Sequence, residues 1–331
     1  MKSVKRKKIF IILLLVLFAA SSLFIGVSDL TISDIFHDEA KRNLFFASRW
    51  PRLVSVIVVG AGMSITGVVM QQISGNRFVS PSTAGTLDFA KLGILTAIML
   101  TPSASIAVKL LLAFSFALGG SWMFLFIINR IRMKDSAFIP IIGMMFGGIV
   151  SSVTTFIGYQ FDLIQNIDSW LQGRFSLIIT GRYELLLLGI PILLLIYFYA
   201  DRFTIAGMGD SVSHSLGLNY RLTVSLGLIL CSLMSAAVVV TVGTIPFIGV
   251  IIPNIVSIYM GDHIKKTLPY IALAGSSFLL ICDTLGRVLI YPYEVSISVT
   301  TGTIGSAIFL YLILGRNKSA GKRRVQRGTD S

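Results

Sequence analysis

The stretch LTVSLGLILCSLMSAAVVVTVGTIPFIGVIIPNIVSIYMG, from Leu222 to Gly261, runs for forty residues without Asp, Glu, Lys or Arg. About 20 apolar residues in a helix are enough to cross the hydrocarbon core of a bilayer, so this stretch has twice the length of one span. Gly243-Thr244-Ile245-Pro246 in its middle predicts a break between two helices. Backbone freed at such a break must be buried in protein or line an aqueous cavity.

The rest of the chain repeats this pattern of long apolar segments. Of its 331 residues, 54% are hydrophobic and 13% are charged, about half the charge that is usual for a soluble domain. We expect an all-α polytopic membrane protein that forms one transmembrane unit over residues 1–331, with a disordered basic tail at residues 318–331. The expected spans number about ten: Ile9–Val27, Leu53–Ile73, Ala84–Leu100, Ile106–Ile128, Ala137–Gly158, Leu185–Ala200, Leu222–Thr241, Phe247–Met260, Leu268–Ile290 and Val299–Leu314.

The formal charge of +13 fits a membrane topology better than a nucleic-acid partner. Most Lys and Arg residues fall in short loops and tails on the side of the N-terminus, and an even number of spans brings the C-terminus to that side too. Because cytoplasmic loops carry the excess of Lys and Arg, both termini are expected in the cytoplasm, with the chain in the cytoplasmic membrane.

Signals of an enzyme or of a metal site are missing from the sequence. It has no GxxxxGK[ST], HExxH or GxSxG motif. His37, His214 and His263 lie far apart in expected loops, and Cys231 and Cys282 stand alone in apolar runs. We therefore expect no catalytic residue, metal or cofactor, and an energy source on a separate subunit.

Two pairs of oppositely charged residues fall inside the expected spans. Asp88 and Lys91 are three apart in the third span, and Asp283 and Arg287 are four apart in the ninth, so each pair shares one helix face. Charges within a bilayer are costly and usually pair or face a cavity. Two readings stay open for each pair: a self-neutralising pair that fixes helix packing, or a role in a transport pathway or in docking.

A polar loop at Asp201–Arg221 contains the sequence GDSVSHSLG from Gly209 to Gly217. Asp210 as a cap and Gly217 as a stop predict a short helix there. This helix is either a cytoplasmic surface for a partner or an ordinary connection.

Several motifs follow one another in order: Arg49-Trp50-Pro51-Arg52, Gly60–Gln71 with Asn76 and Pro81, Ser169-Trp170-Leu171-Gln172-Gly173, Gly209–Gly217, Gly243–Pro253, the trio Asp283, Arg287 and Glu294, and Gly302 with Gly305. In this order they resemble the FecCD/BtuC-type permeases, the membrane subunits of ATP-binding-cassette (ABC) importers for ferric siderophores, haem and cobalamin. The resemblance covers nearly the whole chain and implies the BtuC-like fold of type II importers.

The resemblance also implies partners and roles. The partners are a cytoplasmic ATP-binding subunit, a second, homologous but different permease, an extracytoplasmic substrate-binding protein and a ferric siderophore. Arg49, Arg52 and Arg287 match positions that receive the binding protein. The ATPase would dock at Asp210, Ser213, Leu216 and Gly217.

Some positions depart from the common family pattern: Asn254 stands where many members have His, Ser296 and Ser298 stand in the E-x-P-x-G region, and Arg77-Phe78-Val79 replaces P-L-A. These departures resemble the catecholate branch, which includes enterobactin, anguibactin and petrobactin permeases. The alternatives are a haem or cobalamin permease, or an ion-coupled secondary transporter in which Asp88 or Asp283 would carry the proton.

Overall fold

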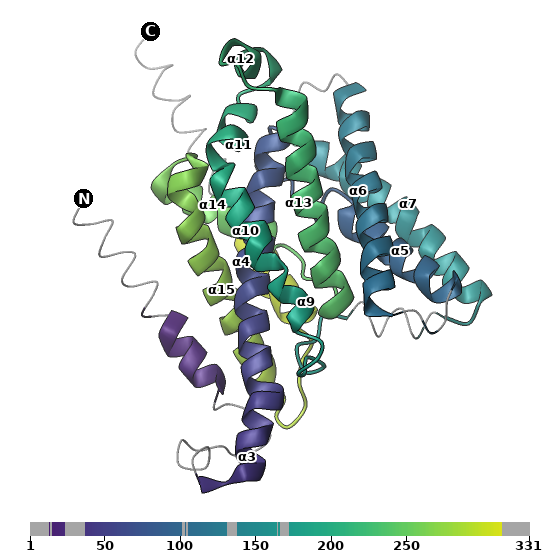
Figure 1. The fold of residues 1–331 in the computed structure, drawn as a ribbon, viewed down its shortest axis with the longest axis vertical. Helices are drawn as coiled ribbons and strands as arrows, with labels where there is room; N and C mark the ends of the chain where they lie inside the picture. The colour runs from purple at the N-terminus through teal and green to yellow at the C-terminus, as the bar shows by residue number, and fades with distance from the viewer. Residues whose placement is uncertain are drawn as a thin grey trace.

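The computed structural model describes residues 13, 15–23, 37–100, 103, 105–130, 138–163, 165 and 172–312. Within these ranges the chain is a bundle of helices without strands (Figure 1). The ends of the expected first span, the segment Ser169–Leu171 and the tail at 318–331 lie outside the described residues.

Helices occur at each of the expected spans, the first of them represented by residues 15–23. The helices are α3 (Glu39–Leu44), the π-helical η1 (Phe45–Arg49), α4 (Trp50–Ile73), α5 (Thr86–Leu100), α6 (Ile106–Arg130), α7 (Phe138–Gln160), α9 (Glu184–Leu187), α10 (Gly189–Phe198), α11 (Ala200–Ala206), α12 (Asp210–Ser215), α13 (Tyr220–Thr241), α14 (Ile248–Met260), α15 (Ile264–Val288) and a last helix, Ile297–Leu312. The expected all-α polytopic architecture is confirmed.

Five helices in the described part are long and apolar enough to cross a bilayer by themselves: Glu39–Ile73, Ile106–Ile128, Ile141–Gln160, Tyr220–Thr241 and Ile264–Val288. The α9–α11 segment would make a sixth as a bent span. Two more apolar helices, α14 and Ile297–Leu312, are shorter. Each of these two helices follows a non-helical stretch, at residues 242–247 and 289–296 respectively.

Helix α4 runs through the middle of the bundle and is buried over almost its whole length (Figure 1). Small residues let its neighbours come close. A Cβ atom added at Gly60 would lie 2.7 Å from the Gly275 carbonyl oxygen of α15, and one at Gly67 would lie 2.0 Å from the Gly249 carbonyl oxygen of α14. Helices in a membrane associate through this kind of close packing, because the lipid tails remove the hydrophobic driving force.

Two non-helical segments and the start of the last helix, Ile297–Leu312, meet where α13 gives way to α14. The Arg174 N–H donates to the Val242 carbonyl (3.0 Å), and the Ile297 N–H donates to the Gly173 carbonyl (2.9 Å). The Ser298 hydroxyl donates to the Thr244 carbonyl and accepts from the Gly173 N–H (2.9 Å). The segments therefore satisfy one another's backbone groups, as irregular backbone inside a membrane protein requires.

One expected span differs from the structure. The segment Leu185–Ala200 was predicted to be a single helix, but the structure divides it among α9, α10 and α11, with a bend of 61° after Phe198. Pro191 has no N–H and cannot lie deep in a helix. It stands in the first turn of α10, where that N–H has no partner to lose, so a new helix begins just before it.

Candidate functional site

Helix α4 begins and α15 ends at the end of the bundle opposite α12 (Figure 1). A cluster of charged side chains joins these two helix ends. Arg52, in the first turn of α4, holds Asp283 of α15 with two bonds, from Nη2 to Oδ1 (2.9 Å) and from Nε to Oδ2 (3.3 Å). Its Nη1 donates to both carboxylate oxygens of Glu294, at 2.8 and 3.0 Å. Such forked contacts are the stronger kind of ion pair, because both charge and geometry match.

Arg287 completes the cluster from one turn further along α15. Its Nη2 lies 2.7 Å from Asp283 Oδ2, and its Nη1 donates to the Ser22 carbonyl at 2.8 Å. Asp283 therefore lies between two arginines, and its side chain is only 3% exposed. We call Arg52, Asp283, Arg287 and Glu294 the ionic cluster; it contains two positive and two negative groups.

The pairing of Asp283 with Arg287 agrees with their spacing on one helix, but the rest of the cluster could not be read from the sequence. Arg52 is 231 residues away from Asp283 and 242 away from Glu294. The one sequence signal for Glu294 was its place after Asp283 and Arg287 in the motif order that resembles the FecCD/BtuC-type permeases.

The structure gives the three expected docking arginines unequal access to a partner. The Arg287 side chain is 3% exposed and that of Arg52 is 13% exposed, because both are turned into the ionic cluster. Arg49 lies one turn before Arg52, is half-buried, and donates from Nη1 to the Leu23 carbonyl at 3.3 Å.

The other intramembrane pair lies on α5. Lys91 Nζ is 3.0 Å from Asp88 Oδ1, and about a fifth of each side chain remains exposed. Gly147 of α7 packs against this pair: a Cβ atom there would lie 2.6 Å from Asp88 Oδ2. The small residue thus leaves room for the carboxylate between α5 and α7.

The loop after α11 contains the expected short helix, α12, at Asp210–Ser215. Its end is as predicted: Gly217 has a φ of +73°, its N–H donates to the His214 carbonyl, and the Leu218 N–H donates to the Ser213 carbonyl. Its start is not. Asp210 was expected to be the cap, but it is the first helical residue, and Gly209 precedes it with a φ of +99° and no side-chain cap. Glycine tolerates that conformation, so no side-chain cap is needed to turn the chain.

The residues of α12 divide into an anchor and an exposed face. Ser213 is fully buried, and its hydroxyl donates to the Gly209 carbonyl at 2.8 Å. Leu216, directly after the helix, is 61% exposed, and Met208, two residues before it, is 60% exposed. An anchored helix with exposed apolar side chains is suited to a protein partner.

Two of the residues that depart from the family pattern, Arg77 and Asn254, line a polar cavity of about 200 Å³ near the same end. Asn254 donates from Nδ2 to the Arg77 carbonyl (2.7 Å) and to the Val250 carbonyl (2.8 Å). Arg77 in turn pairs with Asp262. These residues therefore join the α4–α5 loop to α14 and to the turn after it.

Among the described residues, no group of three or more His, Cys, Asp or Glu could hold a metal ion.

A family model described as the FecCD transport family matches residues 12–315. The chain belongs to the FecCD transport family. The resemblance seen in the sequence is thereby confirmed, and the chain is a multi-pass membrane protein of a family of transport permeases.

Two FecCD relatives show where the chain stands within the family. It is 53% identical to the petrobactin import system permease protein YclN of Bacillus subtilis, over 94% of this chain and 99% of the relative. It is 41% identical to the ferric-anguibactin transport system permease protein FatD of Vibrio anguillarum, over 89% of this chain and 94% of the relative.

Among solved structures, a metal-chelate-type ABC transporter in an inward-facing conformation superposes with a TM-score of 0.80 at 25% identity. The match covers 94% of this chain and 99% of that one. The BtuC-like fold implied by the sequence is therefore confirmed.

Proposed function

We propose that this FecCD chain is the transmembrane permease subunit of an ABC importer for ferric siderophores of the petrobactin type. The observation that carries the proposal is the 53% identity to the petrobactin permease YclN over nearly the full length of both chains. The anguibactin permease FatD, at 41% identity, supports the same ligand class.

The two ends of the bundle would face opposite sides of the membrane. The excess of Lys and Arg on the side of the termini supports a cytoplasmic location for both termini, and the order of the spans assigns the loop that contains α12 to the same side. In this orientation residues 1–331 form one transmembrane unit, and the basic tail at 318–331 extends into the cytoplasm.

The ATP-binding subunit would be a separate chain that docks on α12. Leu216 and Met208 supply exposed apolar contacts there, while the buried Ser213 and the turn at Gly217 hold the helix rigid. A rigid contact is needed because the movement of the ATPase has to be transmitted to the bundle.

At the outer end, a binding protein that carries acidic residues would dock on the surface around Arg49, Arg52 and Arg287. Arg49 would make the direct contact, since it is the more accessible of the three. The ionic cluster would hold the start of α4 and the end of α15 at a fixed separation beneath it.

A second, similar permease would complete the pathway. Helix α7 supports this, because large apolar side chains such as Met145, Ile149 and Phe156 are 64–70% exposed along it. A surface of this kind suits either lipid or a partner chain, and a pathway between two permeases needs the partner.

The proposal can be tested in a strain that lacks this gene, by measuring uptake of radiolabelled iron supplied with one chelator at a time. Restoring the gene is expected to restore uptake of ferric petrobactin, and to leave ferric citrate and cobalamin uptake unchanged. Restored cobalamin uptake, or petrobactin uptake that is unaffected by the deletion, would contradict the proposal.

A further inference from the structure

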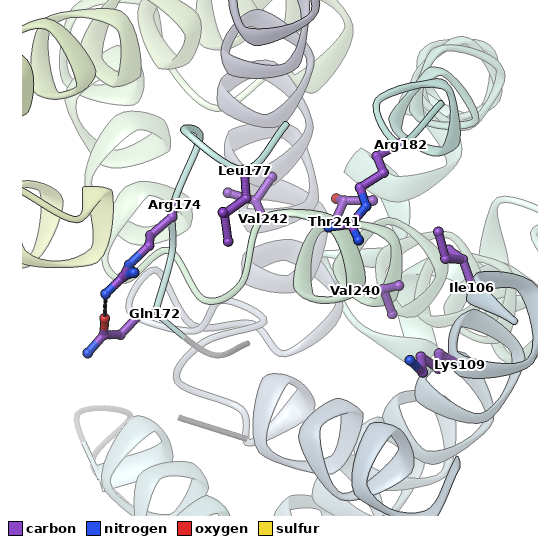
Figure 2. Close-up of a pocket in the computed structure, with 9 residues that line it drawn as sticks. All are labelled: Ile106, Lys109, Gln172, Arg174, Leu177, Arg182, Val240, Thr241 and Val242. Atoms are coloured by element: carbon purple, nitrogen blue, oxygen red, sulfur yellow. Dashed lines mark hydrogen bonds between the residues drawn. The ribbon is translucent and has the colours of Figure 1, made fainter. Parts of the chain in front are cut away.

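Two adjoining hollows at the end of the bundle opposite α12 have no part in the transport function proposed above. The first, which we call the basic cavity, has a volume of about 180 Å³. Lys109 from the first turn of α6, and Arg174 and Arg182 from the segment before α9, line it (Figure 2). In Figure 2, Arg182 and Lys109 project from different elements toward the space beside Val240 and Thr241.

The charge of the basic cavity is one-sided. None of the nine described residues that line it is Asp or Glu. Arg174 donates to the amide oxygen of Gln172, which is neutral. Glu184, two residues after Arg182, turns its carboxylate to the Gly181 N–H at 2.9 Å. The ionic cluster at the same end balances its arginines with carboxylates, whereas the described lining of the basic cavity places no carboxylate beside Arg182.

The second hollow, which we call the apolar groove, is open and has a volume of about 460 Å³. It runs between α6, α9 and α13, and is lined by Leu110, Phe114, Leu185 and Leu233 among others. From Ile106 to Phe114 is eight residues, so along α6 the groove reaches about 12 Å into the bundle. Half of a hydrocarbon core is about 15 Å thick, so the groove reaches through most of the depth of one leaflet.

The two hollows are continuous, because Ile106 and Arg182 line both of them. A cationic cavity at the membrane surface thus opens directly into an apolar groove that descends into the membrane. A soluble anion would leave the groove empty, and a lipid without an anionic group would bring no opposite charge to Arg182. Only an amphiphile with an anionic head matches both.

We propose that the basic cavity and the apolar groove together bind one anionic phospholipid, with its phosphate beside Arg182 and an acyl chain along α6. The volume of the cavity equals that of about six water molecules, which is sufficient for a phosphate group. Guanidinium groups stay charged and match phosphate oxygens in a forked geometry. In the orientation proposed above, this lipid belongs to the outer leaflet; the binding itself does not depend on which siderophore is carried.

The direct test is native mass spectrometry of the purified full-length transporter, titrated in detergent with dioleoyl phosphatidylglycerol or dioleoyl phosphatidylcholine. The wild type is expected to retain one phosphatidylglycerol per permease in preference to phosphatidylcholine. Arg182→Gln should weaken phosphatidylglycerol binding about fivefold, since one cation near a membrane surface contributes about that factor. Arg130→Gln, at the other end of α6, is the matched control and should leave the affinity unchanged.

Two further arms separate this site from general attraction of anions. Ala107→Phe fills the groove without changing a charge, and it should also weaken phosphatidylglycerol binding. Glycerol 1-phosphate, which is a headgroup without acyl chains, should not compete at equal concentration. The proposal is overturned if Arg182→Gln and Arg130→Gln weaken binding equally, if Ala107→Phe has no effect, or if glycerol 1-phosphate competes as well as the lipid.

Discussion

At the end of the bundle that carries Arg52, ion pairs join chain segments more than 200 residues apart, whereas at the other end α12 is held by bonds between near neighbours. Arg52 reaches Asp283 and Glu294, and Arg287 reaches Ser22 in the first helix. The bonds that end α12 span three to five residues, from Gly217 to His214 and from Leu218 to Ser213.

This difference indicates that the residues of the ionic cluster stabilise the fold, whereas the exposed residues at α12 can contact a partner. The side chains of the ionic cluster are occupied by one another, so changing one should affect folding first. The exposed side chains of α12 contribute little to folding, so changing one should affect transport first. The predictions below test this division, starting with the largest expected effect.

Replacing Asp283 by Asn should have the largest effect on stability. The change removes the only carboxylate that contacts both Arg52 and Arg287 among the described residues, and leaves two buried cations close together. Breaking a buried pair in this way typically costs about 3–5 kcal/mol. We expect a much smaller monodisperse fraction and a lower melting temperature in detergent, measured by fluorescence-detected size-exclusion chromatography.

The control for that variant is Asp262→Asn, which removes the partner of Arg77 from an exposed pair. Exposed pairs contribute about 0–1 kcal/mol, so this variant should melt within a few degrees of the wild type. An equal fall in melting temperature in both variants would show that the ionic cluster stabilises the fold no more than an exposed ion pair does.

On α12, Leu216→Glu should lower iron uptake about tenfold while the protein still inserts and melts like the wild type. A carboxylate at the centre of an apolar contact with the ATPase would be desolvated on docking, and central residues of an interface carry most of its binding energy. Leu216→Met keeps an apolar contact and should retain uptake. Normal uptake by Leu216→Glu would remove α12 from the coupling pathway.

Changes to the Asp88–Lys91 pair should cost less stability than changes to the ionic cluster and more than changes to α12. The reason is that this pair is local in sequence and partly exposed. Asp88→Asn or Lys91→Met alone should lower the melting temperature through a loss of about 1 kcal/mol, and the double variant should be closer to the wild type. If the double variant reached normal membrane levels but abolished uptake, the pair would have a direct transport role instead.

The smallest effect is expected at Arg49. Arg49→Glu should slow capture of the binding protein about threefold at low salt, and the difference should disappear at 1 M salt, because contacts at the rim of an interface act mainly on association rate. Arg52→Glu is a poorer probe, since it would bring a third carboxylate to Asp283 and Glu294. Arg42→Glu, on α3 at the same end, is the matched control. If the Arg49→Glu variant and the wild type captured the binding protein at the same rate, Arg49 would have a structural role only.

The sequence was sufficient for the parts of the fold that depend on composition or local spacing. Uncharged runs located the spans, and helical spacing placed Asp283 with Arg287 and Asp88 with Lys91. The break at Gly243–Pro246 was visible because glycine and proline disfavour a continuous helix.

The parts that escaped prediction depend on long-range packing or on backbone alternatives of similar energy. Nothing near Arg52 indicates that Glu294 will lie beside it. The bend after Phe198 has no proline or glycine at its position. Gly209 takes the cap position expected for Asp210, because the glycine backbone itself makes the turn. The basic cavity escaped prediction because it depends on long-range packing: Lys109 and Arg182 line one cavity only when α6 and α9 both pack against α13.

The central claim is that this chain forms an ATP-driven path for a ferric siderophore, and reconstitution tests it most directly. The chain, its companion permease and the ATPase would be placed in proteoliposomes with the binding protein and ferric petrobactin labelled with radioactive iron. We predict accumulation of label only when ATP is supplied on the α12 side, with no accumulation when a proton gradient replaces ATP. Accumulation driven by the proton gradient in the absence of ATP would contradict this account and indicate a secondary transporter.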